Sequence, residues 1–310
     1  MGGFFLIIQS SLSLEAVQRR IDQMLKSEGR STEVFDYVAS ARGKGLRPSL
    51  VFLTFDLCGG TRFDEAISCA AGVELVHMAS LIHDDIIDRS ELRRGQLTVH
   101  RKFGTQAAVL AGDHLFAAAF HLFALSTNRK VSQVMTAVIR DMCAGEINQL
   151  LTPAQSENGY LDYIRRKTAC LIGGCCRLGA ILSEASELEE KKLQEFGENI
   201  GLAFQLTDDV LDYRGVDAVM GKGGGRDFSE GLWTLPIIRA FDRGLIPVNW
   251  STYDFASILS ILEGKGILDD VWQVASAYIR RAEKMLDRLP SSVPQRELTG
   301  LLEKLRGRAR

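Results

Sequence analysis

The sequence predicts an all-α protein, because two observations favour helices and none favours strands. Long segments are rich in Ala, Leu, Glu and Gln and repeat their apolar residues at helical spacing. The chain holds only 6 Pro among 310 residues, so few positions would interrupt a long helix. No segment alternates apolar and polar residues as a half-buried strand does. We therefore expect a helical bundle.

Each expected helix carries an apolar stripe wide enough to pack in such a bundle. In chain order the predicted helices cover residues 14–28, 48–57, 63–88, 105–126, 131–150, 159–183, 187–213 and 271–289. The clearest breaks between them are the turn-forming residues 59–60, 152–153, 221–225 and 289–292. None of these breaks is long or polar enough for an interdomain linker, so residues 1–310 are predicted to form a single domain.

Composition excludes several classes of protein. The chain is 46% hydrophobic with a formal net charge of −2, which indicates a soluble globular protein and argues against a nucleic-acid partner. Its six cysteines lie in apolar helical segments without a CxxC pair, which favours core residues in a reducing compartment. Residues 1–8 are apolar but too short to span a bilayer, and they lack the basic residues of a signal peptide. We expect a cytoplasmic protein.

Two acidic pentads are the most informative local pattern. They read DDIID at residues 84–88 and DDVLD at residues 208–212. In a helix, positions i and i+4 share a face and i+1 lies beside it, so each pentad directs three carboxylates toward one small volume. Carboxylates without cysteine suit Mg²⁺, which completes its coordination with water and phosphate oxygens. The pair therefore predicts a diphosphate clamped between metal ions.

A solvated helix end is the alternative interpretation of one such pentad. The residues that lead into the pentads, 70–82 and 200–207, are mostly apolar on all sides, so both helices are expected to be buried. Three acids at the end of a buried helix need a partner of opposite charge. Burial therefore favours metal binding.

Basic residues could complete a diphosphate site. The six candidates are Lys44, Arg47, Arg93, Arg94, Lys167 and Lys222. The first two precede a proline that favours the first turn of a helix, where free N–H groups attract anions. Each residue alone is most often a surface charge. Together they fit two diphosphates, one held on metal and one held by cations.

Five motifs, in order, make the chain similar to the trans-type isoprenyl diphosphate synthases, also called the polyprenyl synthetase family. They are GKGLRP at 43–48, HDDIID at 83–88 followed by RRG at 93–95, KT at 167–168, FQLTDDVLD at 204–212 and GKGGGRD at 221–227. The resemblance implies an isoprenoid-synthase bundle around a deep central cavity, and a homodimer. It also implies Mg²⁺-dependent condensation of isopentenyl diphosphate with an allylic diphosphate, farnesyl or geranylgeranyl, in successive trans additions.

The resemblance also assigns roles residue by residue. Magnesium, three ions per active site with diphosphate bound, would be held by Asp84, Asp85, Asp88, Asp208, Asp209 and Asp212. The allylic diphosphate would contact Arg93, Lys167 and Lys222. The isopentenyl diphosphate would contact Lys44, Arg47, His77 and Arg94. Thr168 and Gln205 would line the place where the allylic cation forms, and the catalytic set is Asp84, Asp208, Lys167, Thr168 and Gln205.

Two positions depart from the family pattern. Residues 230–236 read EGLWTLP, so Leu232 stands where a phosphate-binding lysine is usual, and Gly45 stands where an extra basic residue is common. These departures leave open a partner-dependent or regulatory subunit. A terpene cyclase also carries an acidic pentad, but the second pentad and the GKGLRP cations favour a site for two diphosphates.

Small residues before the first pentad predict a long product. Ala79 and Ser80 lie one helical turn before Asp84, and Val76 lies one turn further, where a growing chain should run. Candidates for the floor of the cavity are phenylalanines at helical spacing in the opposite helix, Phe116, Phe120 and Phe123. Core packing is the alternative role for them. We expect a long-chain, octaprenyl-like synthase whose product passes to a membrane, with a short-chain geranylgeranyl synthase as the alternative.

Overall fold

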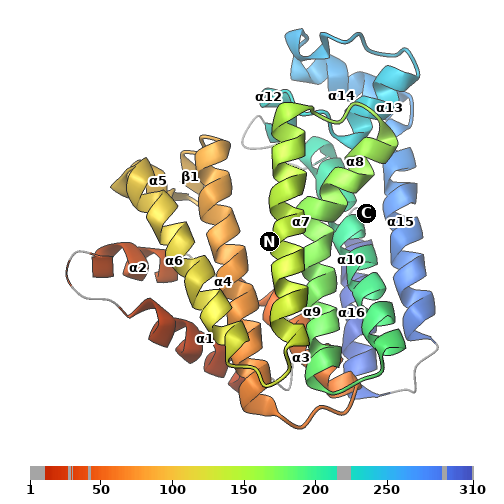
Figure 1. The fold of residues 1–310 in the computed structure, drawn as a ribbon. Helices are drawn as coiled ribbons and strands as arrows, with labels where there is room; N and C mark the ends of the chain where they lie inside the picture. Colours follow the sequence, from red (N-terminus) through yellow and green to blue (C-terminus); the bar gives the residue numbers. More distant parts are fainter. Residues whose placement is uncertain are drawn as a thin grey trace. The chain divides into compact units, whose positions relative to one another are not determined.

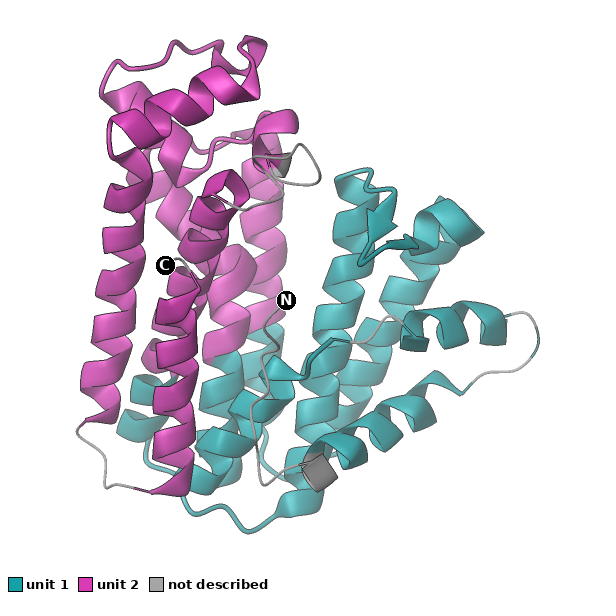
Figure 2. Ribbon diagram, turned by 180° about the vertical axis from the view of Figure 1, so that it is seen from behind, with its two compact units in different colours: residues 1–137, 174–193 teal, residues 138–173, 194–310 magenta. Residues whose placement is uncertain are grey.

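The computed structural model describes residues 11–26, 29, 31–40, 43–214, 225–287 and 292–308. Most of them lie in helices, which confirms the all-α prediction (Figure 1). They fall into two compact units, unit 1 with residues 1–137 and 174–193 and unit 2 with residues 138–173 and 194–310 (Figure 2). Three helices contribute residues to both units: α7 (Lys130–Leu151), α9 (Cys170–Leu182) and α10 (Glu187–Arg214). The single domain stays a prediction.

Unit 1 is built around the long helix α4 (Phe63–Ile87). It packs against α6 (Thr105–Ala124), α1 (Ser11–Leu25) and α3 (Leu46–Leu57), while α2 (Ser31–Ser40) and α5 (Val99–Phe103) join α6. Most α4 side chains are buried, as its apolar sequence predicts. Both α4 and α6 are long and apolar enough to cross a membrane, but they pack against each other within unit 1.

Glycines allow this close packing of α4 on α6. A Cβ atom at Gly72 would lie 2.6 Å from Cε1 of Phe123, so only glycine lets the ring rest on α4. On α6, a Cβ atom at Gly112 would collide with the imidazole of His83. These contacts lie on either side of the residues expected to set product length, and they fix how α4 and α6 face each other.

A short hairpin follows α4. Strand β1 (Leu92–Arg93) pairs antiparallel with β2 (Gln96–Leu97). The turn between them consists of Arg94 with φ 53° and Gly95 with φ 81°, which is the left-handed pair of a type I′ turn. Strands of two residues are too short to show alternation, so the sequence did not predict them.

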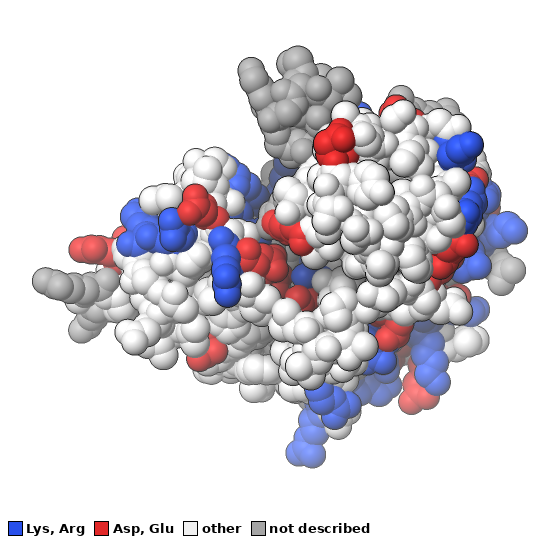
Figure 3. Space-filling model, turned by 90° about the horizontal axis from the view of Figure 1, so that it is seen from above, with Lys and Arg blue, Asp and Glu red and all other residues white. Residues whose placement is uncertain are grey.

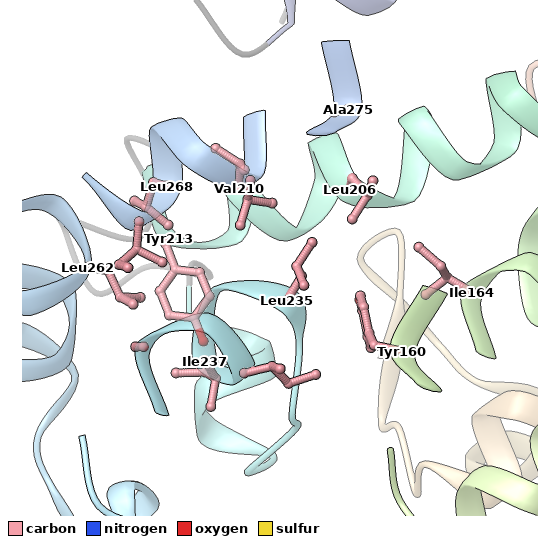
Figure 4. Packing of buried hydrophobic residues seen from close by; sticks show 14 of the residues in the cluster. Tyr160, Ile164, Leu206, Val210, Tyr213, Leu235, Ile237, Leu262, Leu268 and Ala275 are labelled. Carbon is pink, nitrogen blue, oxygen red and sulfur yellow. The ribbon is translucent and has the colours of Figure 1, made fainter. Parts of the chain in front are cut away.

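Unit 2 has its own hydrophobic core, drawn in Figure 4. Helices α8 (Glu157–Ile164), α10, α13 (Leu235–Asp242), α14 (Phe255–Gly264) and α15 (Ile267–Leu286) supply its side chains. The ring of Tyr213 stacks on Phe255 with centroids 6.0 Å apart. Helix α16 (Val293–Gly307) packs along α15, and the short elements α12 (Arg226–Ser229) and η2 (Trp250–Thr252) complete the unit.

Two sequence predictions need correction. The single helix expected over residues 159–183 is divided into α8, a π-helical turn η1 (Arg165–Ala169) and α9. A π turn does not change residue composition, so apolar periodicity cannot reveal it. Cys143 is exposed on α7, so the prediction that all six cysteines are core residues is wrong there.

Candidate functional site

The first acidic pentad forms the last turn of α4, with Asp88 as its C-cap. A helix C-terminus carries partial negative charge, so carboxylates gathered there repel one another unless cations are present. Asp85 is buried, and Nε of Arg93 donates to its Oδ1 at 2.9 Å and its Oδ2 at 3.0 Å. Asp84 is half-buried and Asp88 is exposed. In unit 1, acidic and basic side chains lie close together at this end (Figure 3).

Arg47 and His77 belong to a polar cluster in unit 1, where both are half-buried and Glu74 is buried. Helix α3 begins at Leu46, two residues before its proline, so Arg47 lies in the first turn and Lys44 is exposed just before it. Burial lowers the pKa of Arg47, and the carboxylate of Glu74 opposes that shift. Burial, with the positive charge of nearby arginines, holds the pKa of His77 well below its usual value. His77 is therefore a neutral imidazole at pH 7.

Arg94 joins this cluster across Gly43. A Cβ atom at Gly43 would lie 3.3 Å from Oε1 of Glu74 and 3.6 Å from Nη2 of Arg94, so both groups surround the bare glycine. The chain thus brings together Arg47, His77 and Arg94, three of the four residues expected to bind isopentenyl diphosphate. Glu74 lies among them, although sequence reasoning did not select it.

The second pentad lies in the last turns of α10, in unit 2. Asp209 is 1% exposed, and the hydroxyl of Tyr160 donates to its Oδ2 at 2.6 Å. Burial raises the pKa of Asp209, and the hydrogen bond from Tyr160 opposes that shift. Oδ2 of Asp212 accepts a 3.0 Å hydrogen bond from the backbone N–H of Asp227. Asp209 and Asp212 are therefore held by partners in unit 2.

Asp208 faces a cation from the C-terminal helix. Nη2 of Arg308 lies 3.0 Å from its Oδ1, and the guanidinium carbon lies 4.9 Å from the ring centroid of Phe204. Burial raises the pKa of Asp208 to about 6, and Arg308 opposes the shift. Each pentad therefore already pairs with a guanidinium, Arg93 on Asp85 and Arg308 on Asp208.

The π-helical turn carries Lys167 and Thr168. Nζ of Lys167 lies 3.1 Å from Oε2 of Glu146, and the hydroxyl of Thr168 donates to Oε1 of Gln205 at 3.2 Å. The turn packs closely on α10, since a Cβ atom at Gly201 would lie only 2.4 Å from the backbone of Ala169. The expected catalytic residues Thr168 and Gln205 are thus in direct contact.

The residues predicted to set product length differ in burial. Val76 and Ala79 are fully buried, and the half-buried Ser80 donates its hydroxyl to the carbonyl of His77 at 2.9 Å. Phe123 is buried over Gly72 and Phe116 is half-buried, whereas Phe120 is 37% exposed. Of the three phenylalanines, Phe123 therefore fits a floor best, and the exposed Phe120 does not. Lys222 lies outside the described residues.

The acidic side chains fit a divalent cation only if a substrate supplies further ligands. Among the residues that the structure describes, no three His, Cys, Asp or Glu side chains are grouped as a ready metal site. The first pentad belongs to unit 1 and the second to unit 2. Asp84 and Asp88 nevertheless lie beside Asp85 at one helix end, where a cation would relieve their repulsion, and phosphate oxygens commonly complete the coordination of Mg²⁺. The residues therefore fit a metal that arrives with a diphosphate.

Sequence reasoning missed four polar residues that touch the predicted ones: Glu74, Glu146, Tyr160 and Arg308. Glu74 could have been found, because it precedes His77 by three residues and shares its helical face. Glu146, Tyr160 and Arg308 lie 21, 49 and 100 residues from their partners, and no local spacing relates them.

Comparison with known proteins gives one consistent result. The profile of the family described as Polyprenyl synthetase matches residues 29–245. Heptaprenyl diphosphate synthase component 2 of Geobacillus stearothermophilus is 33% identical over 303 residues, covering 94% of this chain and 93% of that protein. The crystal structure of a decaprenyl diphosphate synthase from Rhodobacter capsulatus has a TM-score of 0.90 at 32% identity, covering 98% of each chain. A polyprenyl synthase from Caulobacter crescentus, complexed with calcium and isoprenyl diphosphate, has a TM-score of 0.87 at 30% identity, covering 98% of this chain and 97% of that one.

Proposed function

Because the chain belongs to the polyprenyl synthetase family, we propose that it condenses isopentenyl diphosphate with an allylic diphosphate in successive trans additions. Farnesyl and geranylgeranyl diphosphate are the proposed primers, and a long-chain polyprenyl diphosphate is the proposed product. The observation that carries the proposal is an acidic pentad on each of two core helices, each already paired with a guanidinium. Acidic residues in this arrangement favour the binding of a metal-bound diphosphate over contact with solvent alone.

The proposed metal is Mg²⁺, with three ions when diphosphate is bound. The more accessible acids would coordinate it directly: Asp84 and Asp88 at the end of α4, and Asp208 with Asp212 at the end of α10. When bound, magnesium neutralises the charge that develops on a leaving diphosphate. The calcium-bound relative supports a divalent cation at this kind of site. Asp85 and Asp209 would support the others, since both are buried against Arg93 and Tyr160 respectively.

The chemistry needs charge stabilisation and the exclusion of water. The C–O bond of the allylic diphosphate breaks with its electron pair going to the diphosphate, which Lys167 and Arg93 would hold. The isopentenyl double bond attacks the allylic carbon, and a proton passes to the released diphosphate as the new trans double bond forms. The bonded pair Thr168 and Gln205 would direct oxygen atoms toward the cation.

Product length is proposed to depend on α4 and α6. Small side chains at Ser80 and Ala79 leave room for a chain that extends from Asp84 along α4. Phe123, seated on Gly72, would stop that chain several turns below. This distance favours a long-chain product over the short-chain geranylgeranyl product.

The proposed assembly is a homodimer in the cytoplasm. An exposed apolar stripe on α6, which includes Val109, Leu110 and Phe120, supports burial against a second copy. A partner subunit is the second candidate. It is supported by the relative whose name makes it one component of a heptaprenyl synthase, and by Leu232. A long apolar product would then pass to a membrane.

The test is incubation of purified protein with Mg²⁺, radiolabelled isopentenyl diphosphate and farnesyl diphosphate. Chromatography of the dephosphorylated products is expected to give a ladder that ends at a long prenyl alcohol. A ladder that stops at geranylgeraniol would establish the short-chain alternative. Folded protein that incorporates no label with any primer would contradict an autonomous synthase and favour the partner-dependent one.

A further inference from the structure

Glu74 is a buried acid to which neither the motifs nor the relatives' names assign a role. It lies in the middle of α4, 8% exposed, ten residues before Asp84. Its Oε2 is buried and has no hydrogen-bond partner among the described residues. A buried carboxylate costs free energy unless positive charge compensates it. The groups that compensate it are the guanidinium groups of Arg47 and Arg94, which oppose the rise that burial gives its pKa.

Arg94 adopts a backbone conformation that needs support from its surroundings. Its φ of 53° lies in the left-handed region, which costs a residue other than glycine about 1 kcal/mol. The type I′ turn at Arg94 and Gly95 joins β1 to β2, and the Arg94 side chain lies close to Gly43. There Nη2 of Arg94 and Oε1 of Glu74 lie around Gly43, which leaves space that a Cβ atom would take. The residue with the strained backbone is thus the one whose side chain lies near Glu74.

The guanidinium group of Arg47, in turn, is stabilised by a nearby negative charge. Burial lowers its pKa, Glu74 opposes that shift, and its Nε is buried without a hydrogen-bond partner in the described part of the chain. Two guanidinium groups beside a neutral His77 would repel each other in the absence of Glu74. A carboxylate this close to the site would repel a diphosphate directly. Its favourable contribution must therefore come through the arginines.

We propose that Glu74 is a positioning residue for isopentenyl diphosphate: its carboxylate holds Arg47 and Arg94 in the orientation that binds the substrate. The inference rests on the proposed function, which places both arginines at that diphosphate. Glu74 acts through them and does not touch the substrate.

Glu74→Gln tests the inference, because it keeps the size of the side chain and removes the charge. The expected result is an increase of about tenfold in both the KM and the metal-free Kd for isopentenyl diphosphate, which corresponds to the loss of about 1.4 kcal/mol of binding free energy. The KM for the allylic diphosphate should change less than twofold. Titration calorimetry measures the Kd without turnover, so the inference is tested even if wild-type protein makes no product.

Glu65→Gln is the matched control. Glu65 lies on the same helix and accepts hydrogen bonds from Ser126 and Thr127, far along α4 from the cluster. The Glu65→Gln variant should have a lower melting temperature and unchanged affinities for both substrates. A Glu74→Gln variant with unchanged or tighter isopentenyl diphosphate binding, or with both KM values raised equally, would overturn the inference.

A double-variant cycle tests whether Glu74 acts through Arg94. If it does, Glu74→Gln combined with Arg94→Gln should raise the Kd for isopentenyl diphosphate by clearly less than the product of the two single increases. Fully multiplicative increases would show independent roles and would also overturn the inference. Wild-type protein that binds isopentenyl diphosphate but turns over none would contradict the proposed function alone.

Discussion

The hydroxyl of Tyr160 donates a 2.6 Å hydrogen bond to Oδ2 of Asp209, and both side chains are buried. The bond joins α8, just before the π-helical turn, to the second acidic pentad on α10. It also opposes the effect of burial, which raises the pKa of Asp209. The phenol therefore favours a charged carboxylate at this position.

Tyr160→Phe should weaken the second pentad while the fold is kept. Loss of the donor leaves a buried carboxylate with one fewer partner, at a cost of about 1–3 kcal/mol in the free energy of unfolding. The Mg²⁺ concentration needed for half-maximal activity should rise. Urea unfolding and a magnesium titration measure the two effects. Tyr163→Phe, in the same helix, is the control, and an equal effect there would argue against a specific role for Tyr160.

Asp208 predicts a pH dependence of the metal-free protein. Its folded pKa of about 6 lies above the ordinary value of 3.8, so between these values the folded state binds a proton that the unfolded state does not. The stability from this group is therefore fully present below about pH 4 and is lost as the pH rises through about 6. Magnesium affinity should instead rise with pH, because the metal binds the deprotonated acid.

The measurement is urea unfolding of wild type and Asp208→Asn from pH 4 to 7 without metal. The difference in stability between the two proteins should change across that range and then level off. Arg308→Gln should move the transition to higher pH, because Arg308 opposes the rise in pKa. A difference that is constant with pH would contradict the assignment.

Gly201→Ala should displace the turn that carries Lys167 and Thr168. The added Cβ atom would lie 2.4 Å from the backbone of Ala169, which cannot move without shifting the π-helical turn. We expect a stability loss of about 3 kcal/mol from overpacking, together with a fall in kcat. Gly300→Ala is the control, since nothing lies within 4 Å of a Cβ atom there and helix propensity predicts a gain of up to about 1 kcal/mol. Thermal unfolding and single-turnover rates measure both variants.

Phe123 should act as the floor for the growing chain. Removing its ring opens space above Gly72, so Phe123→Ala should lengthen the product. The buried ring also contributes about 3–5 kcal/mol, so Phe123→Leu provides a milder variant in case the first does not fold. Phe120→Ala, at an exposed position of the same helix, should leave product length unchanged. Longer products from Phe120→Ala, or unchanged ones from folded Phe123→Leu, would contradict this role.

The sequence predicts what depends on local spacing. The long helices and the burial of the residues that precede Asp84 follow from residue type and helical period. The π turn at Lys167 did not follow, because it changes hydrogen bonding without changing composition. The contacts of Tyr160 and Arg308 join residues far apart in the chain, so only the fold reveals them. Exposure of Phe120 likewise depends on which face of α6 meets α4.

Leu232→Lys should raise the activity, because it restores the basic residue usual at this position of the family. Leu232 is 40% exposed and its backbone N–H donates to the carbonyl of Asp227 at 2.9 Å, so a lysine fits without disturbing the turn. One added charged contact to a diphosphate is worth about 1.5–3 kcal/mol, which corresponds to a gain of roughly tenfold or more in kcat/KM for the allylic substrate. Leu188→Lys adds the same charge at an exposed position in unit 1 and should give no gain. Equal rates for Leu232→Lys and wild type would mean that other cations already hold that diphosphate, and that Leu232 does not account for any dependence on a partner.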